Sequence, residues 1–399
     1  MKYSMFVMLD RFLGSTLCFL LSFFNLFRIK KNRSYSEEKN ILFIQLSELG
    51  AIVLASPTLK RIKELYPDVK LHYITFDLHK PIFDLFDDIS FAGIYTINTT
   101  GFYKFVTDLG KVIHILLSKH FDVIFDFEFF SRFSALLTGL SSAPAKLGFS
   151  HKDTYRGNFY THQILFKPNT HVSELFYSFL EIYNSELKKV CDEFDRDITS
   201  VLTLPNLKSS GFSEKDSVVA KIKKNGASFR NYILIHAHTG KLKLRDWGKS
   251  NFVEFTKKLL DMFGESEVYL IGNSDAVCFN EEICRGVGSK RCFNFSRIFS
   301  LSELRVLFSE TLFFFGVDGG LSHIASLMGA KKVYVLFGPE TPDVFGPLGS
   351  NVECFYADLE CSPCFTLVNY RCSCCKDNIC LSSIKSDLVL NKICLNKLK

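Results

Sequence analysis

The stretch GVDGGLSHIASLMGA holds the residues of this 399-residue sequence that are best suited to binding a phosphate. Asp318 ends a strongly apolar run, and Gly319 and Gly320 let a ligand approach the backbone closely. Ser322 and His323 then begin a predicted helix, whose N-terminus presents N–H donors and a partial positive charge. Such a helix end suits a phosphate or diphosphate, to which His323 can add a hydrogen bond. The alternative is structural: Asp318 caps the helix and His323 is an interior histidine with satisfied hydrogen bonds.

Two further loops offer cations and hydrogen-bond donors for the same ligand. In HAHTGKLKLRDW, Thr239 opens a loop after a predicted strand, and Lys243 and Arg245 supply positive charge. The loop FGPETPDVFGP is rich in Gly and Pro and makes Thr341 available. Because the carboxyl ends of parallel strands meet at one edge of a sheet, we expect the three loops to form a cradle for a nucleoside diphosphate. A surface lysine is usually only solvated, so no single cation is decisive.

These loops need a sheet to hold them, and alternating strand-like and helix-like segments predict two sheets. Strands are expected at residues 41–46, 69–75, 121–127, 145–150, 232–238, 267–272, 311–318 and 332–338. Helices are expected between them, at residues 51–65, 251–263, 280–286 and 321–328 among others. The alternation predicts an α/β protein with two doubly wound parallel sheets. No G-x-G-x-x-G follows a predicted strand, which disfavours a nicotinamide or flavin site.

Composition and charge fit two domains preceded by a short segment. Apolar residues make up 47% of the chain, including 42 Phe, which is enough for two cores. We expect an N-terminal segment at residues 1–39 and domains at residues 40–210 and 211–399, divided within the polar stretch 208–231. The net charge of +6 is too small for a nucleic-acid groove but favours anionic membranes or phosphorylated ligands. The 13 Cys do not suggest a small disulfide scaffold, so a reducing compartment is expected.

The N-terminal segment is strongly apolar. The run at residues 5–27 is interrupted by Asp10 and Arg11, which leaves 16 uncharged residues, at 12–27. A transmembrane helix needs about 20, so the run predicts a re-entrant or interfacial helix. The basic cluster RIKKNR that follows would lie on anionic headgroups and keep the rest of the chain in the cytoplasm. The alternative is a helix packed on the protein's own surface.

Four blocks of the sequence resemble those of one enzyme family. The blocks are LSELGAIVLASPTLKRIKELYPD, FDVIFDFEFFSRFSALLTGLSSAPAKLGF, ILIHAHTGKLKLRDWGKSNFVEFTKKL and GVDGGLSHIASLMGAKKVYVLFGPETPDVFGP. In order and spacing they resemble the successive blocks of family 9 glycosyltransferases, the bacterial heptosyltransferases, over roughly residues 40–384. The last block is the most specific.

The resemblance implies a GT-B fold, in which two Rossmann-like domains face each other across a cleft. The C-terminal domain would bind a nucleotide sugar and the N-terminal domain the acceptor, with inversion at the anomeric carbon and no required divalent metal. Family membership favours ADP-heptose as the donor and a lipid-linked saccharide, such as lipopolysaccharide core, as the acceptor. The reaction would then take place at the cytoplasmic face of the bacterial inner membrane.

The resemblance also gives roles to single residues. Asp318, Gly320 and His323 match the family's diphosphate-binding D-x-G-x-x-H. Arg245 stands where the family usually has a lysine, a substitution that keeps the charge but changes the geometry. Asp275 lies in the family's G-x-x-D segment near the donor.

The loop SELGA corresponds to the family's acceptor-side loop, to which Ser47 and Gly50 belong. The family's L-G-D carries the expected base directly after the glycine, where this sequence has Ala51. Alanine cannot take a proton. Either the protein is a non-catalytic sugar-nucleotide-binding or scaffold protein, or another carboxylate serves. A nucleotide-sugar epimerase of similar shape, which needs no acceptor, is a further alternative.

Two carboxylates are candidates for the missing base. Glu48 lies three residues from Ala51, and Glu128 follows a strand that we expect beside the first one. Apolar neighbours of Glu128 can raise its pKa toward the range useful for a base. The structural alternatives are an N-cap or solvated turn for Glu48, and an ion pair with Arg132 for Glu128.

The C-terminal region is rich in cysteine. In LECSPCFTLVNYRCSCCKDNICLSSI, a tetrahedral zinc or iron site is most simply made by Cys361, Cys364, Cys375 and Cys380. The alternative is reduced cysteines that serve only in packing. The resemblance implies no required cofactor, and the cysteine pattern leaves a structural metal open.

Overall fold

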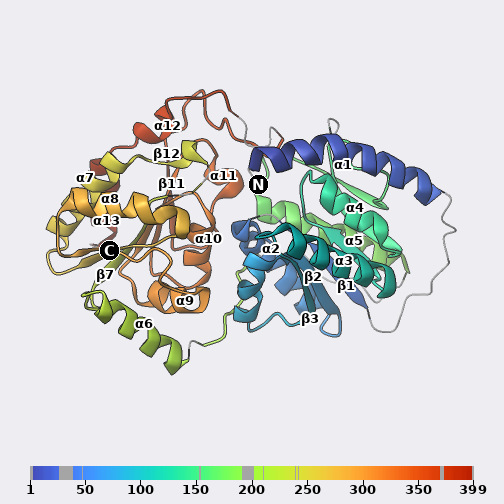
Figure 1. Ribbon diagram of the computed structural model, residues 1–399, viewed down its shortest axis with the longest axis horizontal. Coiled ribbons are helices and arrows are strands. Elements are labelled where there is room, and N and C mark those ends of the chain that lie inside the picture. Colours follow the sequence, from blue (N-terminus) through green and yellow to red (C-terminus); the bar gives the residue numbers. More distant parts are fainter. Residues whose placement is uncertain are drawn as a thin grey trace. The chain divides into compact units, whose positions relative to one another are not determined.

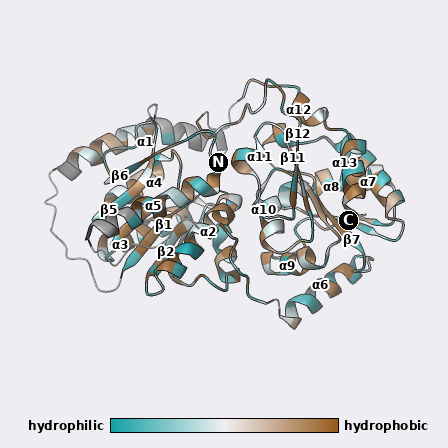
Figure 2. Ribbon diagram, turned by 180° about the vertical axis from the view of Figure 1, so that it is seen from behind, coloured by the Kyte–Doolittle hydropathy of each residue, from teal (hydrophilic) through white to brown (hydrophobic). Residues whose placement is uncertain are grey.

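The computed structural model describes residues 3–26, 39–46, 48–151, 154–190, 202–209, 211–238, 240, 242–368 and 373–397. The chain divides into two compact units, Met1–Asn206 and Leu207–Lys399. Each unit is built on one six-stranded sheet whose strands are all parallel (Figure 1). Hydrophobic residues, drawn in brown, run along the strands of both sheets (Figure 2). The prediction of an α/β protein with two parallel sheets is confirmed.

The sheet of the first unit has the order β3-β2-β1-β4-β5-β6. Its strands are β1 (Asn40–Ile44), β2 (Lys70–Phe76), β3 (Phe91–Ile97), β4 (Val123–Asp126), β5 (Ala145–Ser150) and β6 (His162–Leu165). The connecting helices are α2 (Leu49–Leu65), the 3₁₀ helix η1 (Asp77–Leu85), α3 (Phe102–Ser118), α4 (Arg132–Leu140) and α5 (Val172–Val190). This is the strand order of the Rossmann fold.

The core of this unit has two layers because β1 is buried on both faces. Leu42 and Ile44 belong to one cluster with residues of α3 and α4. Phe43 points to the other face, where its ring contacts Phe125 and Phe127 at centroid distances of 5.3 Å each. These rings in turn pack on α5. A strand buried on both faces is apolar at every position, which explains why the run ILFI predicts a central strand.

The second unit repeats the same topology with the order β12-β11-β10-β7-β8-β9. Its strands are β7 (Tyr232–His236), β8 (Glu267–Leu270), β9 (Cys292–Asn294), β10 (Phe314–Val317), β11 (Val333–Phe337) and β12 (Val352–Tyr356). Its helices are α6 (Phe212–Lys224), η3 (Lys243–Arg245), α7 (Lys249–Met262), η4 (Ser274–Ala276), α8 (Val277–Val287), α9 (Leu301–Glu310), α10 (Gly320–Leu327), α11 (Pro342–Phe345), α12 (Ile379–Ser382) and α13 (Ser386–Lys397). Trp247 is buried in the core of this unit, and its indole N–H donates to the carbonyl of Ile384 at 2.8 Å.

The apolar N-terminus forms α1 (Tyr3–Leu26), which packs along α4 of the first unit (Figure 1). Among the described residues, no helix is both long and apolar enough to cross a membrane. The packing on α4 agrees with the alternative of a helix on the protein's own surface.

All eight strands expected from the sequence are present, and four strands are additional. The additional strands are β3, β6, β9 and β12, which are the outer strands of the two sheets. Outer strands are less buried: β6 has two exposed positions among its four residues, and β3 has only one fully buried position. They therefore lack the continuous apolar run by which the inner strands were recognised.

The buried His72 makes the stability of the first unit depend on pH. Its ring lies between Asn40 Oδ1, at 3.0 Å from Nε2, and the hydroxyl of Tyr95, at 3.3 Å from Nδ1. Burial, aided by the charges of Lys119 and Lys70, lowers the pKa of His72 to about 4. In the unfolded chain the pKa is about 6.5, so between these values the unfolded state binds more protons. The free energy of unfolding should therefore fall as the pH drops from about 6.5 toward 4.

We predict that His72→Gln, which keeps polar atoms but does not titrate, has a smaller loss of unfolding free energy between pH 6.5 and pH 5 than the wild type. Denaturant unfolding at both pH values measures this loss. An equal loss in the two proteins would show that the pKa of His72 is not lowered in the folded state.

Candidate functional site

In both sheets the strand order reverses at the centre, and the candidate residues lie at this reversal. In the first unit β1 lies next to β4, with Ile44 opposite Asp126. In the second unit β7 lies next to β10, with His236 opposite Gly316. At such a point the loops that leave neighbouring strands turn to opposite faces of the sheet and leave room for a ligand. The candidate site of the first unit is therefore formed by the loops after β1 and β4, and that of the second unit by the loops after β7 and β10.

In the second unit the central feature is a buried cation held by two carboxylates. Arg245 ends the short helix η3 after β7 and is 6% exposed. Its Nε lies 3.2 Å from Oδ2 of Asp318, which follows β10. Its Nη2 forms an ion pair with Glu340, which follows β11 and is fully buried. Three strand ends are thus joined by one guanidinium, whose planar fork suits such bridging.

The helix α10 begins directly behind this cluster. Its N-cap is Gly319, whose backbone is extended and which offers no side-chain cap. Asp318 is therefore not the cap that the structural alternative required, since its carboxylate pairs with Arg245. Gly320 opens the helix, and His323 lies on its first turns, 6% exposed. The residues of the D-x-G-x-x-H pattern are brought together at one edge of the sheet.

Ser322 differs from the expected ligand contact. Its side chain is fully buried, and the hydroxyl donates to the carbonyl of Val317 at 2.9 Å. The hydroxyl is engaged inside the fold, where it fixes the turn from β10 into α10. Only the position of Ser322 at the helix start, and not its side chain, fits the expectation.

The loops after β7 and β8 meet beside the cluster. Asp275, in η4, is exposed, and its Oδ2 lies 3.5 Å from the place that a Cβ would take on Gly240. Gly240 has φ of 74°, in the left-handed region that favours glycine. Lys243 is exposed in η3. Asp275 and Lys243 are thus available at this edge, whereas Thr239 lies outside the described residues.

In the first unit, Glu128 is tied to the loop that follows β1. Its Oε1 accepts a hydrogen bond from the backbone N–H of Leu46 at 2.6 Å, and the side chain is 8% exposed. The expectation that its strand lies beside the first one is confirmed by the β1–β4 pairing. Arg132 lies 3.7 Å from Asp10 of α1, with which it forms an ion pair.

Glu48 stands at the N-cap of α2 and is exposed, and it makes no side-chain capping bond. Gly50 and Ala51 form the first turn of this helix, with Gly50 buried. Burial lowers the pKa of His79 to about 4, and the charge of Glu48 opposes this shift, which places the two side chains within electrostatic reach. Ser47 lies outside the described residues. The two candidate bases therefore flank one loop, one at its surface and one beneath it.

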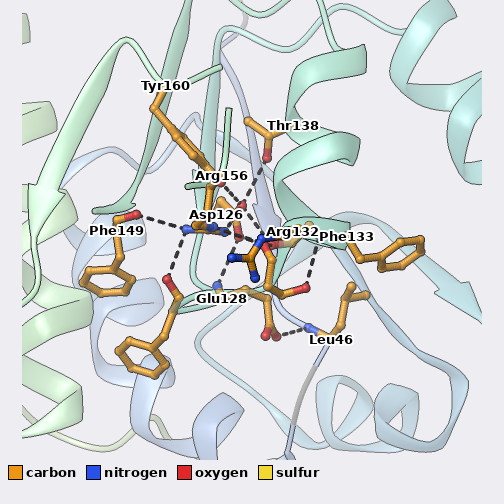
Figure 3. A network of polar contacts seen from close by, with 12 residues as sticks. Leu46, Asp126, Glu128, Arg132, Phe133, Thr138, Phe149, Arg156 and Tyr160 are labelled. Carbon is orange, nitrogen blue, oxygen red and sulfur yellow. Dashed lines mark hydrogen bonds and ion pairs between the residues drawn. The ribbon is translucent and has the colours of Figure 1, made fainter. Parts of the chain in front are cut away.

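A buried polar network around Asp126 holds the backbone of Glu128 (Figure 3). Asp126, at the end of β4, is fully buried, and its Oδ2 accepts from Arg156 at 2.7 Å, Tyr160 at 2.6 Å and Ser134 at 3.0 Å. Its Oδ1 accepts from the backbone N–H of Glu128 at 3.1 Å. Burial raises the pKa of Asp126, and the Arg156 guanidinium opposes the rise.

Arg156, the cation of this network, also bonds to the surrounding backbone. It donates to three backbone carbonyls, those of Phe129, Ser131 and Phe149. These carbonyls belong to the loops that follow β4 and to the end of β5, so a single guanidinium fixes the backbone around Glu128. Sequence reasoning did not identify this network, although an aspartate inside the apolar run FDVIFDF is a signal, since a buried carboxylate needs a partner.

The four predicted metal-ligand cysteines occupy one region of the second unit. Cys380 is buried, Cys361 is exposed, and Cys364 and Cys375 are half-buried thiols. Burial raises the pKa of Cys380 to about 11, and the charges of the other three add to the rise, so all four lie within electrostatic reach. Over the ranges that the structure describes, which leave out Cys372, no three His, Cys, Asp or Glu side chains are arranged to hold a metal ion.

Comparison with known proteins identifies the family. The model of glycosyltransferase family 9 (heptosyltransferase) matches residues 109–372. The chain belongs to glycosyltransferase family 9. No curated protein matches the sequence. The matched region contains Glu128, Arg245, Asp318 and Glu340, whereas Glu48 and the rest of the loop after β1 lie before it.

Solved structures share the fold at low sequence identity. A family 9 glycosyltransferase from Veillonella parvula DSM 2008 has a TM-score of 0.69 and 15% identity, covering 90% of this chain and 97% of that chain. ADP-heptose lps heptosyltransferase II of E. coli has a TM-score of 0.65 and 18% identity, covering 90% and 100%. TibC of enterotoxigenic E. coli, an iron-containing dodecameric glycosyltransferase, has a TM-score of 0.54 and 13% identity, covering 92% and 78%. This family 9 protein therefore has the expected GT-B fold.

Arg245 should be the residue on which the stability of the second unit's site depends. Arg245→Met leaves Asp318 and Glu340 as buried carboxylates without their cation, and we expect it to cost about 3–5 kcal/mol in the free energy of unfolding. Arg245→Met combined with Glu340→Gln should recover part of this loss. The matched control is Lys243→Met, an exposed cation two residues away, which should change stability by less than about 0.5 kcal/mol.

Denaturant unfolding of the four proteins measures these differences. If Arg245→Met unfolds at the same denaturant concentration as Lys243→Met, then the buried cluster does not stabilise the unit.

Proposed function

We propose that this family 9 protein is an inverting glycosyltransferase that moves a sugar from a nucleoside diphosphate to a hydroxyl of a lipid-linked saccharide. The observation that carries the proposal is the Arg245–Asp318 pair at the strand reversal of the second unit, next to the start of α10. The first donor to test is ADP-heptose and the first acceptor lipopolysaccharide, because the name of the E. coli heptosyltransferase II contains both. We propose the cytoplasmic face of the bacterial inner membrane as the place of reaction.

The donor half of the reaction needs positive charge where the leaving group develops negative charge. When the acceptor oxygen attacks the anomeric carbon, the bond from that carbon to the diphosphate oxygen breaks, and the diphosphate leaves with the electron pair. Lys243 and the N–H groups at the start of α10 stabilise this charge. Arg245, whose own charge is met by Asp318 and Glu340, holds the surrounding loops in place. Attack on the face opposite the leaving group inverts the anomeric carbon.

The acceptor half needs a base, and we assign it to Glu48. Its side chain is exposed at the N-cap of α2, three residues before Ala51. Glu128 is buried, and its Oε1 is engaged by the N–H of Leu46, so it acts as a positioning residue for the same loop. The proton of the acceptor hydroxyl passes to the Glu48 carboxylate as the new bond forms.

Single substitutions separate the two roles. Glu48→Gln should lower kcat by about 100-fold or more with an unchanged Tm and an unchanged KM for the donor, because only proton transfer is lost. Glu128→Ala should lower the free energy of unfolding by about 1–3 kcal/mol, since the buried N–H of Leu46 loses its acceptor. Glu128→Gln keeps an oxygen at this place and should retain most of the stability and activity.

Steady-state kinetics and thermal unfolding of the three variants measure this. The roles are reversed if Glu128→Gln abolishes kcat at an unchanged Tm while Glu48→Gln does not.

The whole proposal is tested by a thermal-shift screen of nucleotide sugars, followed by transfer assays with membrane extract. We expect a shift with a nucleoside-diphosphate sugar and a lipid product heavier by one sugar. Binding without turnover would favour a non-catalytic sugar-nucleotide-binding or scaffold protein. Conversion of the donor without any acceptor would favour an epimerase.

We propose in addition that Cys361, Cys364, Cys375 and Cys380 close around one structural zinc or iron ion when it binds, since in the part of the chain that the structure describes their side chains are not arranged to hold one. Four thiols in one region are a donor set that both metals accept, and the related TibC is iron-containing. The ion would tie the segment after β12 to α12, in which Cys380 lies. It takes no part in the transfer.

Elemental analysis of protein purified without added metal tests this site. About one zinc or iron per chain is expected. Cys361→Ser with Cys380→Ser should remove it, and the exposed Cys278→Ser, on α8, should not. A metal content near zero in the wild type would remove the hypothesis.

A further inference from the structure

The helix α1 has an unusual distribution of side chains between its two faces. The residues at every fourth position, Asp10, Gly14, Cys18 and Ser22, are small or polar, and they form the face that packs on the first unit. A surface helix of a globular protein normally turns its large apolar residues to the core and its polar residues to water. In α1 this arrangement is reversed.

The inner face is fixed by specific contacts. The carboxylate of Asp10 accepts from the backbone N–H groups of Arg132 and Phe133, at 3.0 and 2.9 Å, at the N-terminus of α4. Gly14 sits against Arg132, whose Cβ would lie 2.8 Å from a Cβ added at this glycine. Ser22 accepts from the N–H of Asn158 at 3.0 Å. The face of α1 that meets the first unit is therefore determined.

Cys18 lies at the centre of this inner face. It is fully buried in a small cluster with Ala135 of α4 and Phe159, and its thiol donates to the carbonyl of Arg132 at 3.8 Å. Burial raises the pKa of Cys18 to about 11, so the thiol stays neutral. Asp10 therefore has a structural role on this inner face, since it accepts hydrogen bonds at the N-terminus of α4 and forms an ion pair with Arg132.

The outer face of α1 carries large apolar side chains that are about half exposed in the part of the chain that the structure describes. Their exposed fractions are Leu13 57%, Leu17 49%, Phe19 63%, Leu20 46% and Phe23 52%. Exposed large apolar residues are normal when single, but five on one helix form a continuous patch, which marks an interaction surface. The contacts of the inner face fix the rotation of α1 about its axis. The opposite face, with its large apolar side chains, therefore points away from the first unit.

The sequence directly after α1 shows which partner suits this patch. Residues 28–33 read RIKKNR, four cations in six residues, and the first acidic residue after them is Glu37. An anionic bilayer offers apolar chains to the patch and negative headgroups to the cations. A symmetric dimer through α1 would instead bring together two copies of the same basic segment.

We propose that α1 docks the protein on an anionic lipid bilayer, lying in the plane of the interface with Leu13, Leu17, Phe19, Leu20 and Phe23 inserted among the acyl chains. The bonds of Asp10 to α4 hold the helix parallel to the surface of its own unit and prevent it from crossing the bilayer. This inference deepens the proposed function, because a lipid-linked acceptor lies on the same surface. It is tested without donor or acceptor, so its failure is distinct from failure of the transfer reaction.

Flotation with lipid vesicles tests the apolar patch. The full chain should float with vesicles of phosphatidylglycerol and phosphatidylethanolamine and much less with pure phosphatidylcholine. Leu17→Ser with Phe19→Ser should weaken binding at least about tenfold, because partly exposed apolar area no longer enters the bilayer. The matched control, Leu388→Ser with Phe212→Ser, removes one Leu and one Phe that are 57% and 92% exposed in the second unit. It should bind as the wild type does.

The cations are tested by Lys30→Gln, Lys31→Gln and Arg33→Gln together. This variant should lose at least about tenfold in binding to anionic vesicles and little in binding to neutral ones. Thermal unfolding of each variant excludes misfolding as the cause of a loss of binding. For the patch variant the Tm should equal that of the wild type, because the altered side chains are exposed.

Three results would overturn the proposal. The wild type does not float with anionic vesicles, or the patch variant floats as well as its control. In the third, the wild type does not bind vesicles, and light scattering shows a dimer that the patch variant disrupts and its control does not. This result would assign α1 to contact with a second copy.

Discussion

The reversal of strand order at the centre of each sheet is the constraint on which the site depends. It occurs between β1 and β4 in the first unit and between β7 and β10 in the second. Loops leaving these strands turn to opposite faces, so the carboxyl edge opens there and nowhere else along the six-stranded sheet that the structure describes. The residues with candidate roles in either unit belong to these loops or to their direct neighbours. Because both units have the same order, one topological rule locates both halves of the chemistry.

Each unit also places a buried arginine–aspartate pair at this point. Asp126 ends the fourth strand of the first unit and pairs with Arg156, and Asp318 follows the fourth strand of the second unit and pairs with Arg245. Their surroundings differ. Arg156 is surrounded by backbone carbonyls and holds loops in place, whereas Arg245 is shared with a second carboxylate, Glu340. The first pair supports the loop around Glu128, and the second is a charged cluster at the proposed donor site.

The inner strands of both sheets could be predicted from the sequence, and the edge strands could not. The eight inner strands are mostly buried and rich in apolar residues, whereas β3, β6, β9 and β12 lie at the edges and have one buried position each. In the site, the D-x-G-x-x-H residues and the nearness of Glu128 to the first loop were predictable, because local pattern and strand pairing determine them. Glu340 and Arg156 were not, since a pair 95 or 30 residues apart leaves no local pattern. Ser322 shows the opposite error: its position was predicted correctly, but its hydroxyl bonds to its own strand.

The central claim is that these loops together transfer a sugar to a lipid-linked saccharide. Mass spectrometry of the lipid-linked saccharides from the native organism, with and without the gene, tests it most directly. The account predicts that the deletion strain lacks the mass of one sugar and of any sugars added after it, and that wild-type protein restores them. Identical mass spectra from the two strains would contradict it.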